Sequence, residues 1–451
     1  MSGIVIIGAG LAGSLLAIYL AKRSITVDVY EARGDMRLQE VAAGRSINLA
    51  LSDRGIAALR EIGMDEYMLA EAVPMQGRMI HTVSGETKLL PYSGRQGEYI
   101  NSVSRAGLNI ALMNEAERYD GVTFHFNQRC VYFDCASGEA KFSNGVRVKS
   151  DTVIATDGAG SIVRNAMLHG GVERFDFSQV WLEHGYKELH IPARVDGSFR
   201  LEKNALHIWP RNKFMMIALP NFDGSFTCTL FLAHKPQDEG AAFSRLVDEA
   251  SVVEFFEREF PDATKLMPTL VEDFFANPTG NLGTVKCFPW NASGNGLLLG
   301  DSAHAVVPFY GQGMNCAFED VRVLDSLLSE PGTIATGSIV DWKAIYENYS
   351  ELRKVNTDAI ADMAEENFYE MRDAVADPVF VRKRELETKL EQTFPDYFSK
   401  YSMVTFREDL PYSVAKAKGN AQDALLMKLC ADVENASELN LDDVLATVKN
   451  L

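Results

Sequence analysis

Hydrophobic positions near the N-terminus follow two different periods. The continuous apolar run Ile4–Ile7 predicts a buried strand, Leu11–Lys22 carries apolar side chains at helical spacing, and Val27–Tyr30 predicts a second strand. Glycines at positions 8, 10 and 13 form a G-x-G-x-x-G turn between the first strand and the helix. A strand, a glycine-rich turn, a helix and a second strand in this order are typical of a βαβ dinucleotide-binding unit.

This unit carries the chemistry that a dinucleotide needs. Gly8 permits the tight turn, Gly10 lets the backbone approach a pyrophosphate, and Gly13 lets the helix pack closely on the strand. The helix N-terminus offers N–H groups and a partial positive charge to phosphates. Glu31 ends the second strand, where it can bind an adenosine ribose and would repel the 2′-phosphate of NADP. We expect FAD or NAD here; glycines that serve packing alone would leave the acid unexplained.

Two later strands also end at an acid. Val153–Thr156 predicts a buried strand and is followed by Asp157-Gly158, which could lie near a second part of a long cofactor. Leu297–Leu299 predicts another and is followed by Gly300-Asp301, where the acid could bind a ribityl or ribose hydroxyl. Taken alone, the first motif is usually a turn and the second could be a helix cap.

The remaining pattern predicts strands in the middle of the chain and helices after them. Helices are expected at Ser52–Ile62, Ser102–Tyr119, Met314–Leu328, Asp341–Val375 (one or two helices, stopped by Asp377-Pro378), Ala421–Val433 and Leu441–Val448, with a short apolar stretch at Met403–Phe406. Strands are expected within Ala43–Leu51 and Met75–Tyr92, in one small sheet of Val122–Phe126, Val131–Asp134 and Ala140–Phe142, and in an antiparallel meander of Ala205–Trp209, Phe214–Leu219 and Ser225–Leu232. The meander fits either a substrate-pocket wall or a purely structural role.

Composition narrows the function classes. With 451 residues, 47% of them hydrophobic, the chain can bury a large core divided among two or three domains. A net charge of −18 disfavours binding to nucleic acid or an anionic membrane. The six cysteines form no C-x-x-C pair and no metal-ligand spacing with histidine, so we expect reduced thiols and no metal.

The apolar segments also bear on location. The chain starts almost directly on its first strand, which leaves no room for a signal peptide, and no run of ~18 apolar residues predicts a membrane span. These features indicate a cytoplasmic enzyme and leave a homodimer open.

The three acid-bearing motifs together resemble the FAD-dependent aromatic hydroxylases of the p-hydroxybenzoate hydroxylase type. That family usually has Gly-Ala-Asp-Gly at the middle motif, where this chain has Ala155-Thr156-Asp157-Gly158 and keeps the Asp-Gly core. Within that type, nearly the whole chain is similar to the kynurenine 3-monooxygenase family. The stretches that carry this similarity are Gly44–Leu51, Met75–Met79, Gly185–Leu189, Ala205–Pro210, Val307–Asn315 and Tyr401–Phe406. Eukaryotic members have a C-terminal membrane anchor, and this chain is similar to the soluble bacterial members that lack it.

The resemblance implies an α/β fold with three regions. The implied parts are a discontinuous FAD-binding Rossmann-like domain (1–74, 101–178 and 276–330), an antiparallel β-sheet substrate domain (75–100 and 179–275) and a C-terminal helical region (331–451).

The resemblance also implies site residues. Those that would bind the amino-acid end of kynurenine are Arg78, Tyr92, Asn367 and Tyr401. A carboxylate suits a guanidinium with two N–H donors, backed by phenol and amide donors. Those beside the flavin ring would be Pro308, Phe309 and Tyr310, with no proton-transfer role for Tyr310. The cofactor-binding residues would be Gly8, Gly10, Leu11, Ala12, Gly13, Glu31, Arg33, Arg105, Asp157, Asp301, Gly311, Gly313, Met314 and Asn315.

By the same resemblance, the reaction is the 3-hydroxylation of L-kynurenine in tryptophan catabolism and pyridine nucleotide biosynthesis. NADPH would dock transiently and reduce bound FAD, which would form a C4a-hydroperoxide with O2 and hydroxylate the ring carbon ortho to the aryl amine. The amine already activates that carbon, so we expect no certain catalytic side chain, and we expect His304 to pack or cap rather than act as acid or base.

Three other functions fit parts of the pattern. One is a related flavin hydroxylase for a salicylate-like, anthranilate-like or other aminoaromatic or phenolic acid. A second is a flavin halogenase, whose W-x-W-x-I-P signature is missing because all four tryptophans are isolated. A third is a non-enzymatic binding protein on the same fold, which would be colourless and consume no NADPH.

Overall fold

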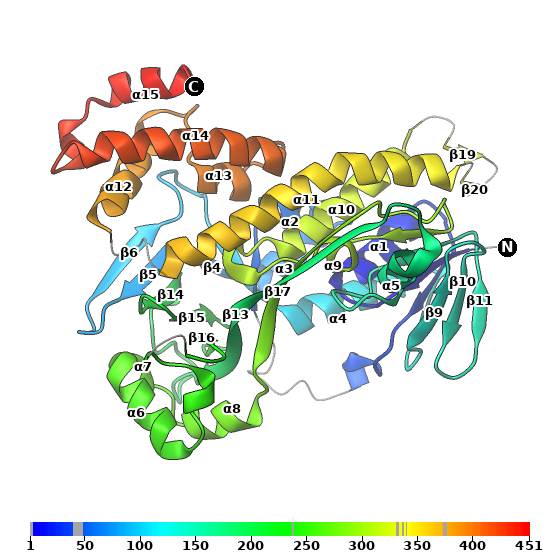
Figure 1. Cartoon of the computed structure of the whole chain (residues 1–451), viewed down its shortest axis with the longest axis horizontal. Coiled ribbons are helices and arrows are strands. Elements are labelled where there is room, and N and C mark those ends of the chain that lie inside the picture. The colour runs from blue at the N-terminus through cyan, green and yellow to red at the C-terminus, as the bar shows by residue number, and fades with distance from the viewer. Residues whose placement is uncertain are drawn as a thin grey trace.

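The computed structural model describes residues 3–38, 48–236, 239–330, 333–335, 338–339, 341–372 and 377–451. Figure 1 shows the N-terminal helix α1 at one end of the molecule, and at the other end helices α12–α15 above a large, mostly antiparallel sheet and helices α6–α8 below that sheet. Of the strand expected within Ala43–Leu51, residues 43–47 lie outside the described residues and Asn48–Leu51 form β3. Residues 373–375 of the predicted Asp341–Val375 helix also lie outside them.

A parallel five-stranded sheet forms the first layer, in the order β18-β12-β1-β2-β8. Its strands are β18 (Gly296–Leu298), β12 (Thr152–Ala155), β1 (Ile4–Ile7), β2 (Val27–Tyr30) and β8 (Val122–His125). Every residue of β1, β12 and β18 is buried, as expected of parallel strands covered on both faces. The placement of Val122–Phe126 in the small sheet was wrong, because β8 pairs with β2 at the edge of the main sheet.

A separate three-stranded sheet does form beside this layer. It contains β9 (Cys130–Asp134), β10 (Glu139–Phe142) and β11 (Arg147–Lys149) in the order β11-β10-β9. The strand β11 is polar and largely exposed, so it has no hydrophobic pattern from which it could be predicted.

Helices α1 (Leu11–Lys22) and α10 (Gly313–Leu328) are confirmed, and α2 (Asp53–Glu61) matches the helix predicted after Ser52. The prediction Ser102–Tyr119 was wrong at its start. Residues Ile100–Ser104 form strand β7 between β3 and β4 (Val73–Met75), and α4 (Arg105–Ala116) follows. Ser104 caps α4, since its hydroxyl accepts a hydrogen bond from the Gly107 N–H.

A seven-stranded sheet forms the second region, in the order β17-β13-β16-β15-β14-β5-β6. Its strands are β5 (Gly77–His81), β6 (Thr87–Pro91), β13 (Asp176–Ile191), β14 (Ala205–Pro210), β15 (Met215–Pro220), β16 (Phe226–Ala233) and β17 (Gly280–Phe288). The predicted meander is confirmed as β14, β15 and β16, and β5 joins it in parallel with β14. Helices α6 (Glu249–Glu259), α7 (Pro261–Thr264) and α8 (Leu270–Ala276) pack on one face.

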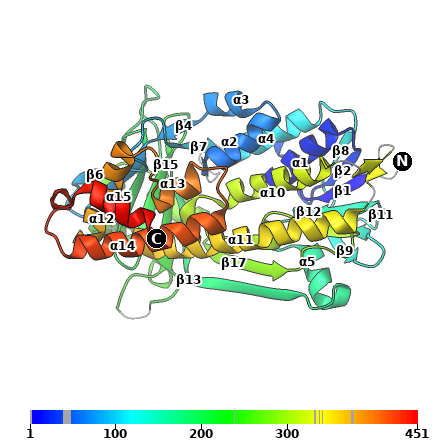
Figure 2. The ribbon, with the colours of Figure 1, turned by 90° about the horizontal axis from the view of Figure 1, so that it is seen from above.

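The C-terminal region is helical. Its helices are α11 (Trp342–Arg372), α12 (Pro378–Thr393), α13 (Lys400–Thr405), α14 (Tyr412–Ala431) and α15 (Leu441–Lys449). The sequence missed α12, in which Pro378 is the first residue after the Asp377 cap, and predicted too short a helix for α14. Seen from above, α11 runs beside α10 and beside the ribbon of β13 and β17 (Figure 2). No helix in the described part of the chain is long and apolar enough to span a bilayer.

Candidate active site

Three turns that are distant in the sequence meet at the carboxyl edge of the parallel sheet. Gly8 has φ +107°, and a Cβ on it would lie 2.5 Å from the Thr156 carbonyl oxygen. A Cβ on Gly13 would lie 2.0 Å from the Gly8 carbonyl oxygen. A Cβ on Gly300 would lie 3.5 Å from the Cβ of Ala12. The turn after β1 therefore contacts the turns after β12 and β18.

The meeting point has the features of a dinucleotide site. Gly10 is the N-terminal cap residue of α1, and it has no side chain to bond the free N–H groups of the helix. A Cβ on Gly10 would meet nothing within 4 Å, so a ligand can approach the backbone closely here. Asp157 Oδ2 accepts a 2.8 Å hydrogen bond from the Ile162 N–H, while its buried Oδ1 has no partner among the described residues. Burial raises the pKa of this carboxyl. A hydroxyl of a bound FAD would supply the missing donor, so these residues fit the cofactor.

Glu31 is held by the turn and by its neighbour. Its Oε2 accepts a 2.9 Å hydrogen bond from the Ala9 N–H, and its Oε1 accepts a 2.8 Å hydrogen bond from Arg33 Nε. Burial acts to raise the pKa of Glu31, but the hydrogen bonds from Arg33 and Ala9 outweigh it and lower the pKa. Since Arg33 offsets this negative charge, the repulsion expected toward a 2′-phosphate is weaker than Glu31 alone suggests.

Two predicted cofactor residues are exposed. Arg105 is the first residue of α4, and Asp301 is the first residue of α9 (Asp301–His304). Their contacts with a cofactor stay predictions, as do those of Leu11 and Met314.

Aromatic rings and a guanidinium form a second group, between the antiparallel sheet and the C-terminal helices. The rings of Tyr92 and Tyr401 stack at 5.0 Å, and the Arg78 guanidinium lies 5.1 Å from the Tyr401 ring centroid. The ring of Tyr310 also stacks on Tyr401, with 5.6 Å between the two ring centroids. Burial raises the pKa of all three phenols, so they remain neutral O–H groups.

A cavity of about 360 Å³, including its opening, lies beside these rings. Its lining residues are Tyr310, Met363, Glu366, Asn367, Glu370, Lys383, Arg384, Glu387, Lys400, Tyr401 and Asp423. Arg78 and Tyr92 lie in the layer behind this wall, where Arg78 Nη1 is 3.5 Å from Glu370 Oε1. Arg78 Nε and the Tyr92 hydroxyl are buried and have no hydrogen-bond partner in the described structure. Their contacts with a substrate stay predictions.

The amide nitrogen of Asn367 already has partners within the protein, and a contact of Asn367 with the substrate stays a prediction. Its Nδ2 donates a 2.7 Å hydrogen bond to the Phe309 carbonyl and also contacts the sulfur of Met371 at 3.3 Å. The amide donor expected for a substrate carboxylate is therefore already used. Its Oδ1 remains as an acceptor at the cavity wall, so Asn367 links the cavity to the 308–315 loop.

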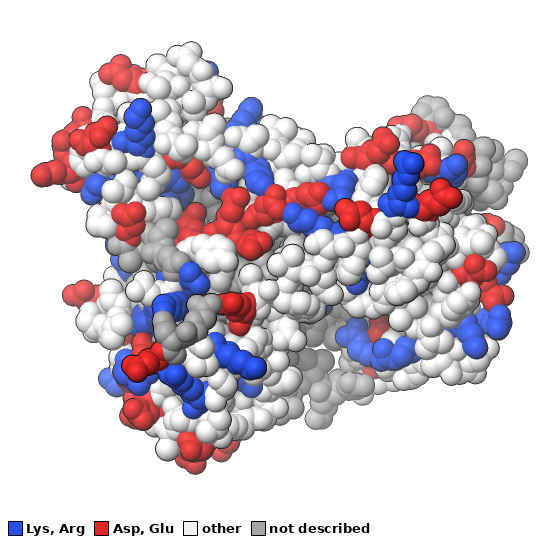
Figure 3. All heavy atoms as spheres, viewed as in Figure 1, with Lys and Arg blue, Asp and Glu red and all other residues white. Residues whose placement is uncertain are grey.

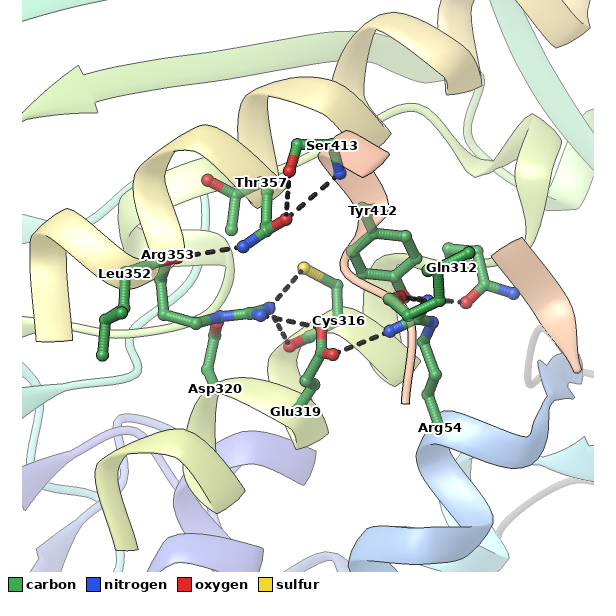
Figure 4. Close-up of polar contacts among 12 residues, drawn as sticks. Arg54, Gln312, Cys316, Glu319, Asp320, Leu352, Arg353, Thr357, Tyr412 and Ser413 are labelled. Atoms are coloured by element: carbon green, nitrogen blue, oxygen red, sulfur yellow. Dashed lines mark hydrogen bonds and ion pairs between the residues drawn. The ribbon is translucent and has the colours of Figure 1, made fainter. Parts of the chain in front are cut away.

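The 308–315 loop is hydrogen-bonded to three other elements: to β3 through Ala50, to α14 through Tyr412 and to α11 through Asn367. Asn315 donates to the Ala50 carbonyl at 2.8 Å and to the Gly311 carbonyl at 2.9 Å. The Tyr412 hydroxyl at the start of α14 donates to Gln312 Oε1 at 2.9 Å. Figure 4 shows Tyr412 and Gln312 facing one another beside Arg54. This C-terminal helix is thus bonded directly to the loop predicted to lie beside the flavin ring.

A buried ion network continues from this point (Figure 4). Glu319 pairs at 2.8 Å with both Arg54 and Arg353, and Arg353 Nε lies 2.7 Å from Asp320 Oδ1. Asp320 Oδ2 contacts His304 Nε2 at 2.6 Å. The buried trio His304, Cys316 and Asp320 has metal-ligand spacing among the described residues. However, Arg353 Nη2 lies 3.4 Å from the Cys316 sulfur, so a guanidinium already takes the place of a cation.

Several residues of the site were missed by sequence reasoning. Glu370 follows Asn367 by three positions on α11, a spacing that puts both on one helix face and could have been recognised. Gln312 lies within the Val307–Asn315 stretch, but its partner Tyr412 is 100 positions away and left no local signal.

The fold and the three convergent turns are those of an FAD-binding protein of the flavin hydroxylase class. A family model described as an FAD binding domain matches residues 1–342. The fold is similar to 2-methyl-3-hydroxypyridine-5-carboxylic acid oxygenase, with a TM-score of 0.67 and 18% identity over 86% of this chain and 97% of that one. It is also similar to p-nitrophenol 4-monooxygenase from Pseudomonas putida, with a TM-score of 0.65 and 17% identity over 92% and 96% of the two chains.

Sequence similarity narrows the class. The chain is 46% identical to a kynurenine 3-monooxygenase of Myxococcus xanthus, over 97% of this chain and 93% of that relative. It is 44% identical to one of Dictyostelium discoideum, over 98% and 96% of the two chains. The chain therefore belongs to the kynurenine 3-monooxygenase family.

Proposed function

We propose that the protein is an FAD-dependent monooxygenase that converts L-kynurenine to 3-hydroxy-L-kynurenine with NADPH and O2. Family membership supports the reaction class. The substrate assignment is supported by two buried donors without a partner in the described structure, Arg78 Nε and the Tyr92 hydroxyl. They lie beside a cavity whose wall includes Tyr310, a residue of the loop predicted to flank the flavin.

The cavity suits a zwitterionic amino acid. Arg78 would bind the substrate carboxylate, which would take the place that Glu370 occupies at 3.5 Å. Glu370 and Asn367 Oδ1 would then accept hydrogen bonds from the substrate ammonium group. The neutral phenols of Tyr92 and Tyr401 would add O–H donors at the carboxylate end.

The chemistry at the ring is the cofactor's. Bound FAD would supply the activation of O2, with NADPH as its reductant. The chain holds the substrate ring against the 308–315 loop, and the closely packed rings of Phe309, Tyr310 and Phe368 exclude water there. Because burial raises the pKa of Tyr310 well above its usual value, this phenol is no proton acceptor, and the aryl amine of the substrate activates its own ring.

The proposal extends to the domain organisation, the location, the assembly and the partners of the protein. The molecule is divided into the FAD-binding, substrate and helical regions given above, and the strands β5 and β6 in the sheet of β13–β17 support this division. It works in the cytoplasm, and a homodimer is its proposed assembly, which light scattering would test. Nucleic acid is no partner, which the acidic side chains along α11 support (Figure 3).

Replacing Arg78 tests the substrate assignment. Arg78→Ala should weaken L-kynurenine binding by about 10- to 100-fold, since a hydrogen bond to a charged group contributes about 1.5–3 kcal/mol. FAD content should remain, because Arg78 lies far from the glycine turns in the fold. Titration of the FAD-loaded enzyme with L-kynurenine provides the measurement.

Arg258→Ala is the matched control, because Arg258 is an exposed arginine on α6 that pairs with Glu254 and Glu259. An Arg78→Ala enzyme with unchanged kynurenine affinity would refute the assignment. Turnover of an anthranilate-like acid in place of kynurenine would favour the alternative hydroxylase.

A further inference from the structure

A buried carboxylate on α12 binds the backbone of two segments that are far apart in the sequence. Glu391 Oε2 accepts a 2.9 Å hydrogen bond from the N–H of Gly94, which lies in the loop after β6. Glu391 Oε1 accepts a 2.9 Å hydrogen bond from the N–H of Ser399, the N-terminal cap residue of α13. The Glu391 side chain is 2% exposed, and a carboxylate buried to this degree is costly unless it is paired and hydrogen-bonded. Glu391 therefore ties the loop after β6 to the start of α13.

The two bonded backbone positions lie next to the two tyrosines of the proposed substrate site. Tyr92 precedes Gly94 by two residues, and Tyr401 follows Ser399 by two residues. The rings of these tyrosines stack with 5.0 Å between their centroids. Because each tyrosine is only two residues from a bonded N–H, the carboxylate fixes the separation of the two backbones that carry the rings.

The groups around Glu391 support this arrangement. Arg95 Nη1 lies 3.6 Å from Glu391 Oε1, and the Arg95 guanidinium packs 3.9 Å from the centroid of the Phe398 ring. The same loop and the segment before α13 are therefore also held together by a cation. The like charge of Glu387, one turn earlier on α12, is offset by Arg384 at 2.8 Å.

The contact also depends on the absence of a side chain at position 94. A Cβ on Gly94 would lie 2.4 Å from the Thr388 carbonyl oxygen and 3.0 Å from the Cβ of Glu391. A side chain at this position would therefore push the loop away from α12 and from the carboxylate.

We propose that Glu391 is a positioning residue that sets the stacked pair of Tyr92 and Tyr401 for the carboxylate of the substrate. This role rests on the proposed kynurenine site, in which the two phenols donate to that carboxylate. Both oxygens of Glu391 are engaged by backbone N–H groups, so its effect reaches the substrate through the tyrosines.

The variant Glu391→Gln tests this role. The amide has the same shape but only one acceptor oxygen, so its NH2 group would face one of the two N–H donors and that hydrogen bond would be lost. The KM for L-kynurenine should rise about 10-fold, because the misplaced phenols would bind the substrate less well. The kcat should change by less than about 2-fold, because this binding is the same in the ground state and the transition state. The affinity for FAD should stay that of the wild type.

A coupling measurement separates positioning from stability. In a background that carries both Tyr92→Phe and Tyr401→Phe, Glu391→Gln should change L-kynurenine affinity by less than about 2-fold, because the hydroxyls that Glu391 positions are gone. Val444→Ala is the stability control, since Val444 is buried in the core of the helical region on α15. It should lower the thermal midpoint and leave the KM unchanged. An equal effect of Glu391→Gln in both backgrounds, or an equal rise of the KM in Val444→Ala, would overturn the proposal.

Hydrogen exchange of the FAD-loaded protein without substrate tests the contact by itself. Mass spectrometry should show faster exchange of the Gly94 or the Ser399 amide in Glu391→Gln than in wild type, and unchanged exchange at both amides would overturn the proposal. If Glu391→Gln does not fold, Gly94→Ala takes its place and should give the same rise of the KM. A wild-type protein that binds no L-kynurenine would refute the proposed function, and the exchange result would still decide whether Glu391 holds the two segments.

Discussion

At the scale of single residues, the Tyr92 hydroxyl is the most informative group. It is buried and lacks a hydrogen-bond partner in the part of the chain that the structure describes. An unsatisfied buried hydroxyl costs stability. Its place beside the cavity, in a stacked pair with Tyr401, supports the prediction that Tyr92 contacts the substrate.

Replacing this hydroxyl separates binding from stability. Tyr92→Phe should leave the thermal midpoint unchanged or higher, because it removes an unpaired polar group. It should weaken L-kynurenine binding by about 3- to 10-fold, the value of one neutral hydrogen bond. Tyr349→Phe is the control, since the Tyr349 hydroxyl is also buried without a described partner but lies in the core of the parallel sheet. Equal affinity in Tyr92→Phe and wild type would remove Tyr92 from the site.

At the scale of elements, a side chain from one turn holds the backbone of another. Thr156 Oγ1 donates to the Gly8 carbonyl at 2.8 Å and to the Ile7 carbonyl at 3.1 Å. The Ala9 carbonyl of the same turn accepts from Asn109 Nδ2 at 3.0 Å. The change from the family's usual Gly-Ala-Asp-Gly to Ala-Thr-Asp-Gly thus adds a hydrogen bond to the phosphate turn.

This contact predicts a measurable effect on the cofactor. Thr156→Val keeps the shape but removes the hydroxyl, so the dissociation constant for FAD should rise by about 3- to 10-fold, and Thr156→Ser should restore it. FAD fluorescence titration of the apoprotein would measure it. Thr152→Val is the matched control, because the Thr152 hydroxyl, at the other end of β12, donates to the Gly294 carbonyl at 2.8 Å. It should lower stability without changing FAD affinity; if both variants bind FAD like wild type, Thr156 has no such role.

The elements also show what the sequence could and could not predict. The βαβ unit and the meander were predicted correctly because their apolar periods are local and strong. The partner of β8 and the boundary between β7 and α4 were missed, because strand pairing depends on distant segments that leave no local pattern. For the site, residue types at motifs were predictable, whereas the engagement of Asn367 with Phe309 required the packed structure.

At the scale of the whole molecule, the C-terminal helices and the FAD-binding region form one connected structure. Tyr412 of α14 reaches Gln312 in the 308–315 loop, and its ring lies 4.0 Å from the buried Arg54 guanidinium. Arg54 pairs with Glu319, and the pairing continues through Arg353 to Asp320. The helical region therefore does more than cover the cavity, because it bonds to the loop predicted to place the flavin ring.

Removing the single hydroxyl at this junction tests the connection. Tyr412→Phe should shift the visible absorption bands of bound FAD and lower coupled hydroxylation by about 3- to 10-fold, since Gln312 loses one neutral hydrogen bond. Tyr346→Phe is the control, because its hydroxyl contacts Thr152 at 3.0 Å in the core, far along the fold from this loop. A Tyr412→Phe enzyme with the spectrum and coupling of wild type would show that the junction is structural only.

One measurement tests the central claim most directly: NADPH oxidation by the FAD-loaded protein with and without L-kynurenine, with the product identified by mass spectrometry. We predict that L-kynurenine accelerates NADPH oxidation and that the product is 3-hydroxy-L-kynurenine. NADPH oxidation that L-kynurenine does not stimulate, or that yields no hydroxylated kynurenine in the presence of bound FAD, would contradict the account.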